Sequence, residues 1–244
     1  MRIAVTSDIH ANLAALEAVL AHAGAVDAIW NTGDCVGYGP QPSECIARLR
    51  EANALWVAGN HERAATGAMS VDEFNQSAAD AALWTREQLS EDEKTFLDAL
   101  PEVTVEGDFT LVHGTLRWPV WEYLDGPDTA LAHLSLQRTR FGFVGHTHVP
   151  ALVTERPDST EGCQIRRLHD GEAIDLSTDE RLVLNPGSVG QPRDGDKRAS
   201  YGILDTDART FTLHRVEYEI AATQRLMDKA GLPVWLIERL DIGR

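Results

Sequence analysis

The segment Arg2-Ile3-Ala4-Val5-Thr6-Ser7-Asp8-Ile9-His10 opens with an apolar run and ends with a carboxylate and an imidazole two positions apart. The run Ile3–Val5 predicts a short buried strand, and Asp8 and His10 then fall in the loop that follows it. Ligands of open α/β folds bind just outside the carboxyl ends of strands. We therefore expect this first strand to deliver two metal-type side chains to a functional edge, provided that later strands bring further ligands there.

The first quarter of the chain alternates helix and strand patterns. Asn12 is expected to cap a helix over residues 13–23, whose apolar residues recur at helical spacing, and a second helix is expected over 42–52. Short apolar runs predict strands over 27–31 and 54–57. This alternation predicts βαβ units, and hence an α/β fold whose sheet begins with parallel strands.

Two stretches of the chain are predominantly helical. Residues 71–89 and 90–100 predict a pair of helices, which we interpret as a cap-like insertion at about 71–100. The tail at about 218–244 predicts two further helices, broken at Gly231-Leu232-Pro233. The insertion has two interpretations, a wall that restricts a pocket or the surface of a homodimer, and its pattern favours neither.

Short strands separated by turns dominate the second half of the chain. Asp128 is expected to cap a helix that ends at Leu136, and the region from Ala151 to Val216 predicts a largely antiparallel half. The expected strands lie over residues 103–106, 110–113, 141–145, 152–155, 164–168, 181–184, 201–205 and 210–216. No internal repeat is present, so we predict a single domain over residues 1–244.

The composition limits the classes of partner. Of the 244 residues 43% are hydrophobic, and the formal net charge is −16. Such a charge disfavours nucleic-acid duplexes and anionic membranes, although bound cations reverse the field locally. Cys35, Cys45 and Cys163 are odd in number and form no C-x-x-C pair, so we predict reduced thiols. Without a signal-peptide pattern or an apolar span, the expected location is the cytoplasm.

Potential metal ligands recur at the ends of the predicted strands. They comprise carboxylates, imidazoles and one amide: Asp8, His10, Asp34, Asn60, His61, His113, His146 and His148. Taken singly, each has an ordinary explanation, such as a turn for Asp34 or a core histidine for His113. Delivered together to one edge of one sheet, they predict a metal site.

The spacing and number of these donors suggest more than one ion. Asp8 with His10, and His146 with His148, are two residues apart and would lie on the same face of a strand. The donors exceed what a single four- to six-coordinate ion needs, and a bridging carboxylate would let two ions share them.

The ligands also belong to ordered motifs. These motifs are Asp8-x-His10, Gly33-Asp34, Gly59-Asn60-His61-Glu62, His113 and Gly145-His146-Thr147-His148. In this order they resemble the motifs of the calcineurin-like metallophosphoesterases. The segment Asn185-Pro186-Gly187-Ser188-Val189-Gly190 is similar to one in the small bacterial and archaeal, phosphodiesterase-like members. The resemblance implies a four-layer αββα sandwich of two mixed β-sheets flanked by helices, with a small helical insertion.

The resemblance further implies a binuclear metal site. One ion would be held by Asp8, His10, Asp34 and His148, and the other by Asp34, Asn60, His113 and His146, with Asp34 bridging. His61 would not be a ligand. It would protonate the leaving oxygen or steady the phosphoryl group.

The chemistry of these residue types agrees with that implication. Imidazole-rich ligation suits two divalent transition-metal ions (Mn, Fe, Zn, Ni or Co) better than Mg or Ca. Two such ions against the carboxylates of Asp8 and Asp34 leave a net positive charge of about two, which attracts a phosphate. A water held between the ions becomes a hydroxide near neutral pH and attacks phosphorus in line. We therefore predict hydrolysis of a small phosphodiester or phosphomonoester, nucleotides included.

Two other functions compete with this prediction. A catalytically silent scaffold on the same fold is disfavoured by the intact ligand set and His61. A dehydrogenase-type nucleotide-binding domain is excluded because Thr6-Ser7-Asp8, and not a glycine-rich loop, follows the first strand.

The chain departs from the family's protein Ser/Thr phosphatases after Gly33-Asp34. Those enzymes carry an arginine there, whereas this chain has Val36-Gly37-Tyr38-Gly39, which argues against phosphoprotein phosphatase activity. Arg193 and Arg117 are candidates to contact substrate instead, although a surface position is favoured for both.

Overall fold

Strand β1 (Arg2–Thr6) lies in the middle of the first of two six-stranded sheets, in a computed structural model that describes residues 1–244. Its side chains alternate between two cores, as a strand requires. Ile3 and Val5 face the core between the sheets, and Ala4 faces the core beneath the helices. Both faces of β1 are therefore buried, which explains its continuous apolar run.

The first sheet is mixed, with the order β3-β2-β1-β11-β12-β9. Strands β1, β2 and β3 are parallel, and β11 joins β1 in the antiparallel sense. The other members of this sheet are β2 (Ala28–Asn31), β3 (Leu55–Trp56), β9 (Ala173–Asp175), β11 (Ala199–Asp205) and β12 (Thr210–Val216).

The second sheet is also mixed, with the order β4-β5-β6-β10-β7-β8. Its parallel pairs are β5 with β6 and β6 with β10. Its members are β4 (Val103–Glu106), β5 (Phe109–Val112), β6 (Phe141–Phe143), β7 (Ala151–Glu155), β8 (Cys163–Arg167) and β10 (Leu182–Asn185). The two sheets pack face to face on a shared core that includes Phe143, Phe211 and Leu213.

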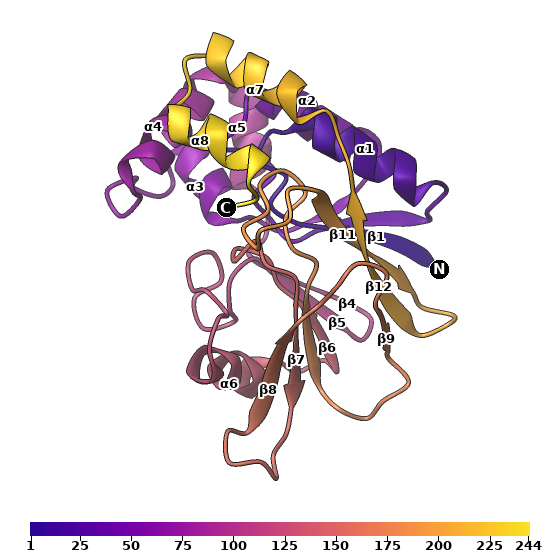
Figure 1. Ribbon diagram of the computed structural model, residues 1–244. Helices are drawn as coiled ribbons and strands as arrows, with labels where there is room; N and C mark the ends of the chain where they lie inside the picture. Colours follow the sequence, from indigo (N-terminus) through magenta and orange to yellow (C-terminus); the bar gives the residue numbers. More distant parts are fainter.

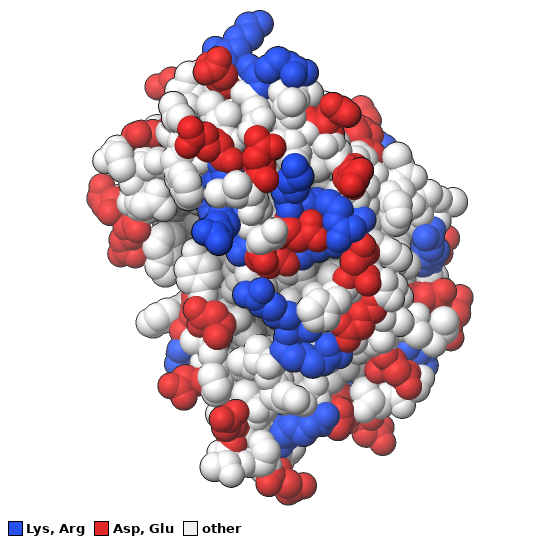
Figure 2. All heavy atoms as spheres, in the orientation of Figure 1, with Lys and Arg blue, Asp and Glu red and all other residues white.

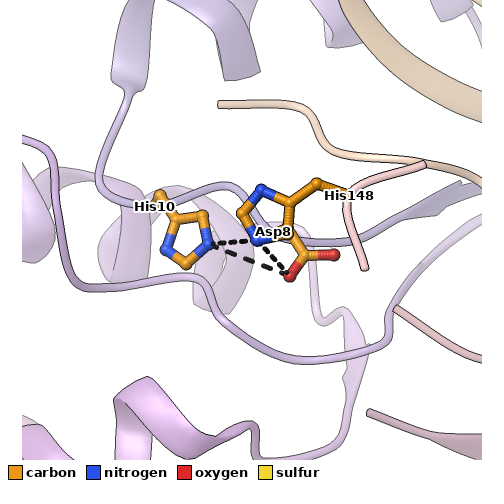
Figure 3. A group of neighbouring side chains, drawn as sticks. All are labelled: Asp8, His10 and His148. Atoms are coloured by element: carbon orange, nitrogen blue, oxygen red, sulfur yellow. Dashed lines mark hydrogen bonds and ion pairs between the residues drawn. The ribbon is translucent and has the colours of Figure 1, made fainter. Parts of the chain in front are cut away.

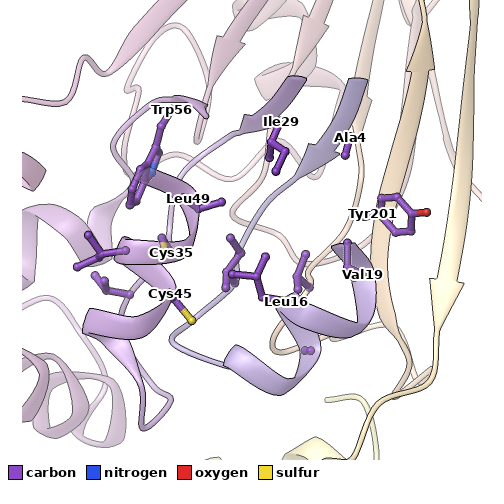
Figure 4. Packing of buried hydrophobic residues seen from close by; sticks show 14 of the residues in the cluster. Ala4, Leu16, Val19, Ile29, Cys35, Cys45, Leu49, Trp56 and Tyr201 are labelled. Atoms are coloured by element: carbon purple, nitrogen blue, oxygen red, sulfur yellow. The ribbon is translucent and has the colours of Figure 1, made fainter. Parts of the chain in front are cut away.

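Helices cover the outer face of each sheet, so the predicted four-layer αββα sandwich is confirmed (Figure 1). The first sheet is covered by α1 (Leu13–Ala23), α2 (Pro42–Glu51), α3 (Asn60–Thr66) and α5 (Glu91–Asp98), which share a core with its strands (Figure 4). Helix α6 (Pro127–Leu136) packs on the second sheet. A separate apolar cluster packs α4 (Gln76–Gln88) against the tail helices α7 (Ile220–Lys229) and α8 (Val234–Glu238) and the 3-10 turn η1 (Arg239–Asp241).

Local signals placed several elements correctly. Helix α1 has the predicted bounds, and the Asn12 side chain accepts from the Ala15 N–H as its cap. The tail helices break at the predicted Gly231-Leu232-Pro233 segment.

Other local predictions are wrong at their boundaries. The first helix of the 71–100 region begins at Gln76 and not at Val71, because the Asn75 side chain accepts from the Ala78 N–H and caps it there. Asp128 does not cap α6, which begins one residue earlier at Pro127. Helix α3 and strand β9 were not predicted.

The largely antiparallel pairing expected over 151–216 is confirmed, since β7, β8, β9, β11 and β12 all pair in the antiparallel sense, but these strands do not form a sheet of their own. Strands β7, β8 and β10 join the second sheet, whereas β9, β11 and β12 return to the first. Strand β11 pairs with β1 over four residues and completes the sheet that the N-terminal strands begin. Long-range pairing decides this division, because the strand patterns themselves are alike.

Charge is unevenly distributed on the surface. Acidic side chains lie around the visible face, while most of its basic side chains lie across the middle (Figure 2). None of the helices combines the length and the apolar character that crossing a bilayer requires.

Candidate metal centre

Loops at the carboxyl ends of five strands bring the predicted site residues together. Asp8 and His10 follow β1, Asp34 follows β2, Asn60 and His61 follow β3, His113 follows β5, and His146 and His148 follow β6. All eight residues are buried, with relative exposures of 5% or less. Since β5 and β6 belong to the second sheet, the expectation of one edge of one sheet is wrong. The site lies where the ends of both sheets meet.

The first donor group consists of Asp8, His10 and His148 (Figure 3). His148 Nε2 lies 3.2 Å from Asp8 Oδ1 and 3.1 Å from His10 Nε2. His10 Nε2 is 3.8 Å from the same carboxylate oxygen. Asp8 Oδ1 is buried and accepts no hydrogen bond within the protein. Two facing imidazole nitrogens beside an unsatisfied carboxylate oxygen fit a divalent cation.

The second donor group consists of Asp34, His113 and His146, with Asn60 beside them. His113 Nε2 lies 3.2 Å from Asp34 Oδ2, 3.0 Å from His146 Nδ1 and 3.2 Å from Asn60 Oδ1. Asp34 Oδ2 is also 3.8 Å from His10 Nε2 of the first group. Asp34 therefore lies between the two groups, where a shared ligand would stand.

The outward nitrogens of the four imidazoles are all engaged by main-chain carbonyls. The pairs are His10 Nδ1 with Val36 O, His113 Nδ1 with Thr32 O, His148 Nδ1 with Gln191 O, and His146 Nε2 with Trp121 O, at 3.1, 2.8, 2.6 and 3.0 Å. A carbonyl can only accept, so each outer nitrogen carries the hydrogen. The inner nitrogen is then the one that would present a lone pair to a bound metal ion.

Five of the ligand residues have left-handed backbone conformations. Their φ angles are 52° for Asp8, 48° for His10, 54° for Asp34, 65° for His146 and 58° for His148. Each such conformation costs about 1 kcal/mol or more in a residue with a side chain. The expectation that His146 and His148 share one strand face is wrong, because they lie in a loop and join different donor groups.

Glu62 organises the loops around Asp34, a role that the sequence did not reveal. Its carboxylate is fully buried and accepts four main-chain N–H groups, at 2.7 to 3.3 Å. The donors are Asp34, Cys35, Val36 and Gly59. The only sequence signal was its place in Gly59-Asn60-His61-Glu62, where no function was assigned to it.

Burial and the Asp34 charge set the protonation of the metal-free site. Burial opposes charge on both Asp34 and His113, yet their mutual attraction holds the pKa of Asp34 well below its usual range. Against the same effect of burial, Asp34 raises the pKa of His113 to about 9. Burial lowers the pKa of His146 to about 3. Metal binding at the second group would therefore displace a proton from His113.

His61 lies against both the first donor group and Asp34. Its ring centroid is 4.9 Å from that of His10, and its main-chain N–H donates to Asp34 Oδ1 at 2.9 Å. Its Nδ1 is buried without a hydrogen-bond partner. Donor atoms of His10, Asp34 and His61 also lie within 4.8 Å of one another. This grouping is open to a ligand role as well as proton transfer, so the role of His61 stays a prediction.

Aromatic side chains lie against the site, and two of them, Tyr123 and Phe74, were not predicted from the sequence. Tyr123 stacks on His146 with centroids 4.0 Å apart, and Phe74 lies 5.3 Å from both His61 and Trp121. Phe74 precedes α4, so the 71–100 region contributes directly to the wall of the site.

A comparison with known families agrees with this geometry. The family model for the calcineurin-like phosphoesterase superfamily domain matches residues 1–209. The chain belongs to this superfamily. The resemblance inferred from the ordered motifs is therefore confirmed. A metal-dependent phosphoesterase in general terms is supported by this membership together with the donor groups.

Relatives of the chain in this superfamily come from bacteria and archaea. An uncharacterized protein of Methanocaldococcus jannaschii is 41% identical over 251 residues, covering 99% of this chain and 98% of the relative. A metallophosphoesterase from Sphaerobacter thermophilus has a crystal structure 46% identical in sequence, with a TM-score of 0.91 and full coverage of both chains. A hypothetical protein from Pyrococcus horikoshii is 19% identical and has a TM-score of 0.78, over 100% of this chain and 98% of that one.

Proposed function

We propose that the protein is a binuclear metal-dependent phosphoesterase that hydrolyses small phosphodiesters or phosphomonoesters, nucleotides included. The observation that carries this proposal is the position of Asp34 between two donor groups. Its Oδ2 is 3.2 Å from His113 Nε2 and 3.8 Å from His10 Nε2. A carboxylate in this position can serve two ions at once.

Different residues of the chain would bind the ions and protonate the leaving group. Asp8, His10 and His148 would hold one ion, and Asn60, His113 and His146 the other, with Asp34 common to both. The ions, when bound, supply an activated water and take up charge on the phosphoryl oxygens. His61 would give a proton to the leaving oxygen, since its buried Nδ1 has no partner in the protein.

The donor types restrict the metal but do not select one. Imidazole nitrogens outnumber carboxylates, which favours Mn, Fe, Zn, Ni or Co over Mg or Ca. We include manganese among the metals to test first. The ligand set supports two ions rather than one because each donor group has its own pair of facing imidazole nitrogens. These nitrogens are 3.1 Å apart in the first group and 3.0 Å apart in the second.

The setting of the reaction is also part of the proposal. The net charge of −16 supports a small substrate rather than a nucleic-acid duplex or a membrane surface. The three cysteines are free and buried, which supports a cytoplasmic location. Whether the protein acts as a homodimer is a separate question that its mass in solution answers.

Metal analysis combined with a substrate panel tests this function. The purified protein should take up about two transition-metal equivalents and cleave p-nitrophenyl phosphate or bis-p-nitrophenyl phosphate. Absence of both uptake and turnover with added Mn, Ni or Co would overturn the proposal. Two bound equivalents without turnover on any ester would instead favour a silent scaffold on the same fold.

A further inference from the structure

We propose that Arg193 binds a non-bridging phosphoryl oxygen of the substrate, with Tyr38 as the residue that positions its guanidinium beside the metal centre. This inference rests on the proposed function and specifies its substrate as a phosphomonoester. It corrects the expectation of a surface arginine, because Arg193 is partly buried and its Nε is fully enclosed.

The main chain around Arg193 is anchored to two metal ligands. The Gly190 N–H donates to Asp8 O at 3.0 Å, and the Arg193 N–H donates to His148 O at 3.3 Å. His148 in turn donates from Nδ1 to Gln191 O at 2.6 Å. The segment that carries Arg193 therefore has a fixed position relative to the first donor group.

The side chain of Arg193 lies against Tyr38. Its guanidinium carbon is 5.7 Å from the Tyr38 ring centroid, and its Nη2 donates to Tyr38 Oη at 3.4 Å. The same Nη2 donates to Gln191 Oε1 at 3.0 Å. The Tyr38 ring centroid is 4.6 Å from that of His10 and 4.3 Å from that of His61. One aromatic ring thus separates the cation from a metal ligand and from the predicted proton donor.

The positive charge of Arg193 is not neutralised by a carboxylate. No Asp or Glu oxygen lies within ion-pair distance of it, and the neighbouring Asp194 pairs with Arg215. Its Nε has no hydrogen-bond partner, although buried donors are normally paired. The other candidate, Arg117, differs because Glu122 accepts from its Nε at 3.0 Å. The Arg193 guanidinium therefore has no counter-ion within the protein, and an oxyanion of the substrate would supply one.

A second guanidinium adds to the excess positive charge in this region. Burial, and to a smaller extent the charge of Arg193, lower the pKa of Arg239 to about 10. The neighbouring Leu240 packs in one apolar cluster with Tyr38, which places the C-terminal turn beside the same ring. An anion at Arg193 would relieve the repulsion between these two cations.

The number of phosphoryl oxygens decides the substrate class. A phosphomonoester has three non-bridging oxygens and a phosphodiester has two. Ions held by the two donor groups would supply positive charge for phosphoryl oxygens. A monoester carries one charged oxygen more than a diester for Arg193 to contact, and charge-assisted contacts of this kind are the strong ones. The structure therefore assigns to Arg193 a preference for monoesters over diesters.

Binding of inorganic phosphate to the metal-loaded protein tests this assignment directly. Isothermal calorimetry should show phosphate binding weakened about tenfold to a hundredfold in Arg193→Gln, and less in Arg193→Lys and Tyr38→Phe. Metal content should stay at the wild-type value in all three variants. Arg48→Gln is the matched control, since Arg48 pairs with Glu17 on the outer helices. Unchanged phosphate affinity in Arg193→Gln, or loss of metal, would overturn the assignment.

Steady-state kinetics separates this inference from the proposed function. Arg193→Gln should raise KM for p-nitrophenyl phosphate by the same factor as the phosphate Kd, and change KM for bis-p-nitrophenyl phosphate by less than about threefold. Equal losses on both esters would refute the monoester assignment and leave the phosphoesterase function standing. A wild-type protein that binds phosphate but cleaves neither ester would refute the function, while the phosphate site would remain.

Discussion

The N–H of Asp34 donates to Glu62 Oε2 at 2.8 Å, so a buried carboxylate that is not a predicted ligand orients the residue that joins the two donor groups. The same oxygen accepts from the Gly59 N–H at 2.7 Å. Glu62 Oε1 accepts from Cys35 and Val36 at 2.7 and 3.3 Å. The loops after β2 and β3 are thereby held to each other through one side chain.

Glu62→Gln should destabilise the protein and weaken metal binding. An amide group would replace one acceptor oxygen and face N–H donors, leaving them unsatisfied at a cost of about 3 kcal/mol. Urea unfolding of the metal-free protein measures the free energy of unfolding, and a metal titration measures affinity. Glu44→Gln serves as the control because Glu44 is exposed on α2. Equal stability of Glu62→Gln and wild type would contradict the role given to Glu62.

His61→Ala should retain both metals and lose rate. Removing a general acid typically lowers kcat by about 10² to 10⁴. The loss should be larger for an alkyl phosphate than for p-nitrophenyl phosphate, whose leaving group needs less protonation. Metal content and kcat on both esters are the measurements. Release of a metal from this variant would show that His61 is a ligand, as its proximity to His10 and Asp34 also permits.

Variants of Asp34 and Asp8 should bind different numbers of metal ions. Asp34→Asn removes the negative charge from the shared position, so the affinity of the protein for both ions should fall. Asp8→Asn removes the carboxylate charge from the group of His10 and His148 alone, so about one equivalent should remain. Equilibrium dialysis with metal analysis gives the number of equivalents that each variant binds, with Asp92→Asn as an exposed control. Identical stoichiometries for the two variants would argue against a shared ligand.

His133 should make stability depend on pH. Burial lowers its pKa to about 4, with Nδ1 accepting from the Leu116 N–H at 3.2 Å. The unfolded chain takes up this proton below about pH 6.5 while the folded chain does not. The stabilisation is therefore complete above pH 6.5 and is lost as the pH falls toward 4, by about 3 kcal/mol.

Urea unfolding of the metal-free protein from pH 7.5 to 4.5 checks this expectation. His133→Asn keeps an acceptor near the position of Nδ1 and removes the titrating group. Its free energy of unfolding should fall less steeply with decreasing pH than that of wild type. Parallel pH profiles for the two proteins would refute the assignment to His133.

The sequence alone determined the elements and the donors that depend on local chemistry. Apolar periodicity and the Asn12 cap define α1, and the continuous apolar run Ile3–Val5 marks a buried strand. The ordered motifs identified the superfamily, and residues of these motifs make up the candidate donor groups. These signals suffice because capping and periodicity involve residues close together in the chain, and each motif is itself a short segment.

Only the tertiary structure decided how the donors are divided and what supports them. His146 and His148 are two residues apart in sequence, yet they lie in a loop after β6 and join different donor groups. Glu62 can accept from both Asp34 and Gly59 only because the loops after β2 and β3 meet. Arg193 lies against Tyr38 only because the loop after β10 folds back on the loop after β2. Local patterns carry no information about such contacts, because packing between elements far apart in the chain creates them.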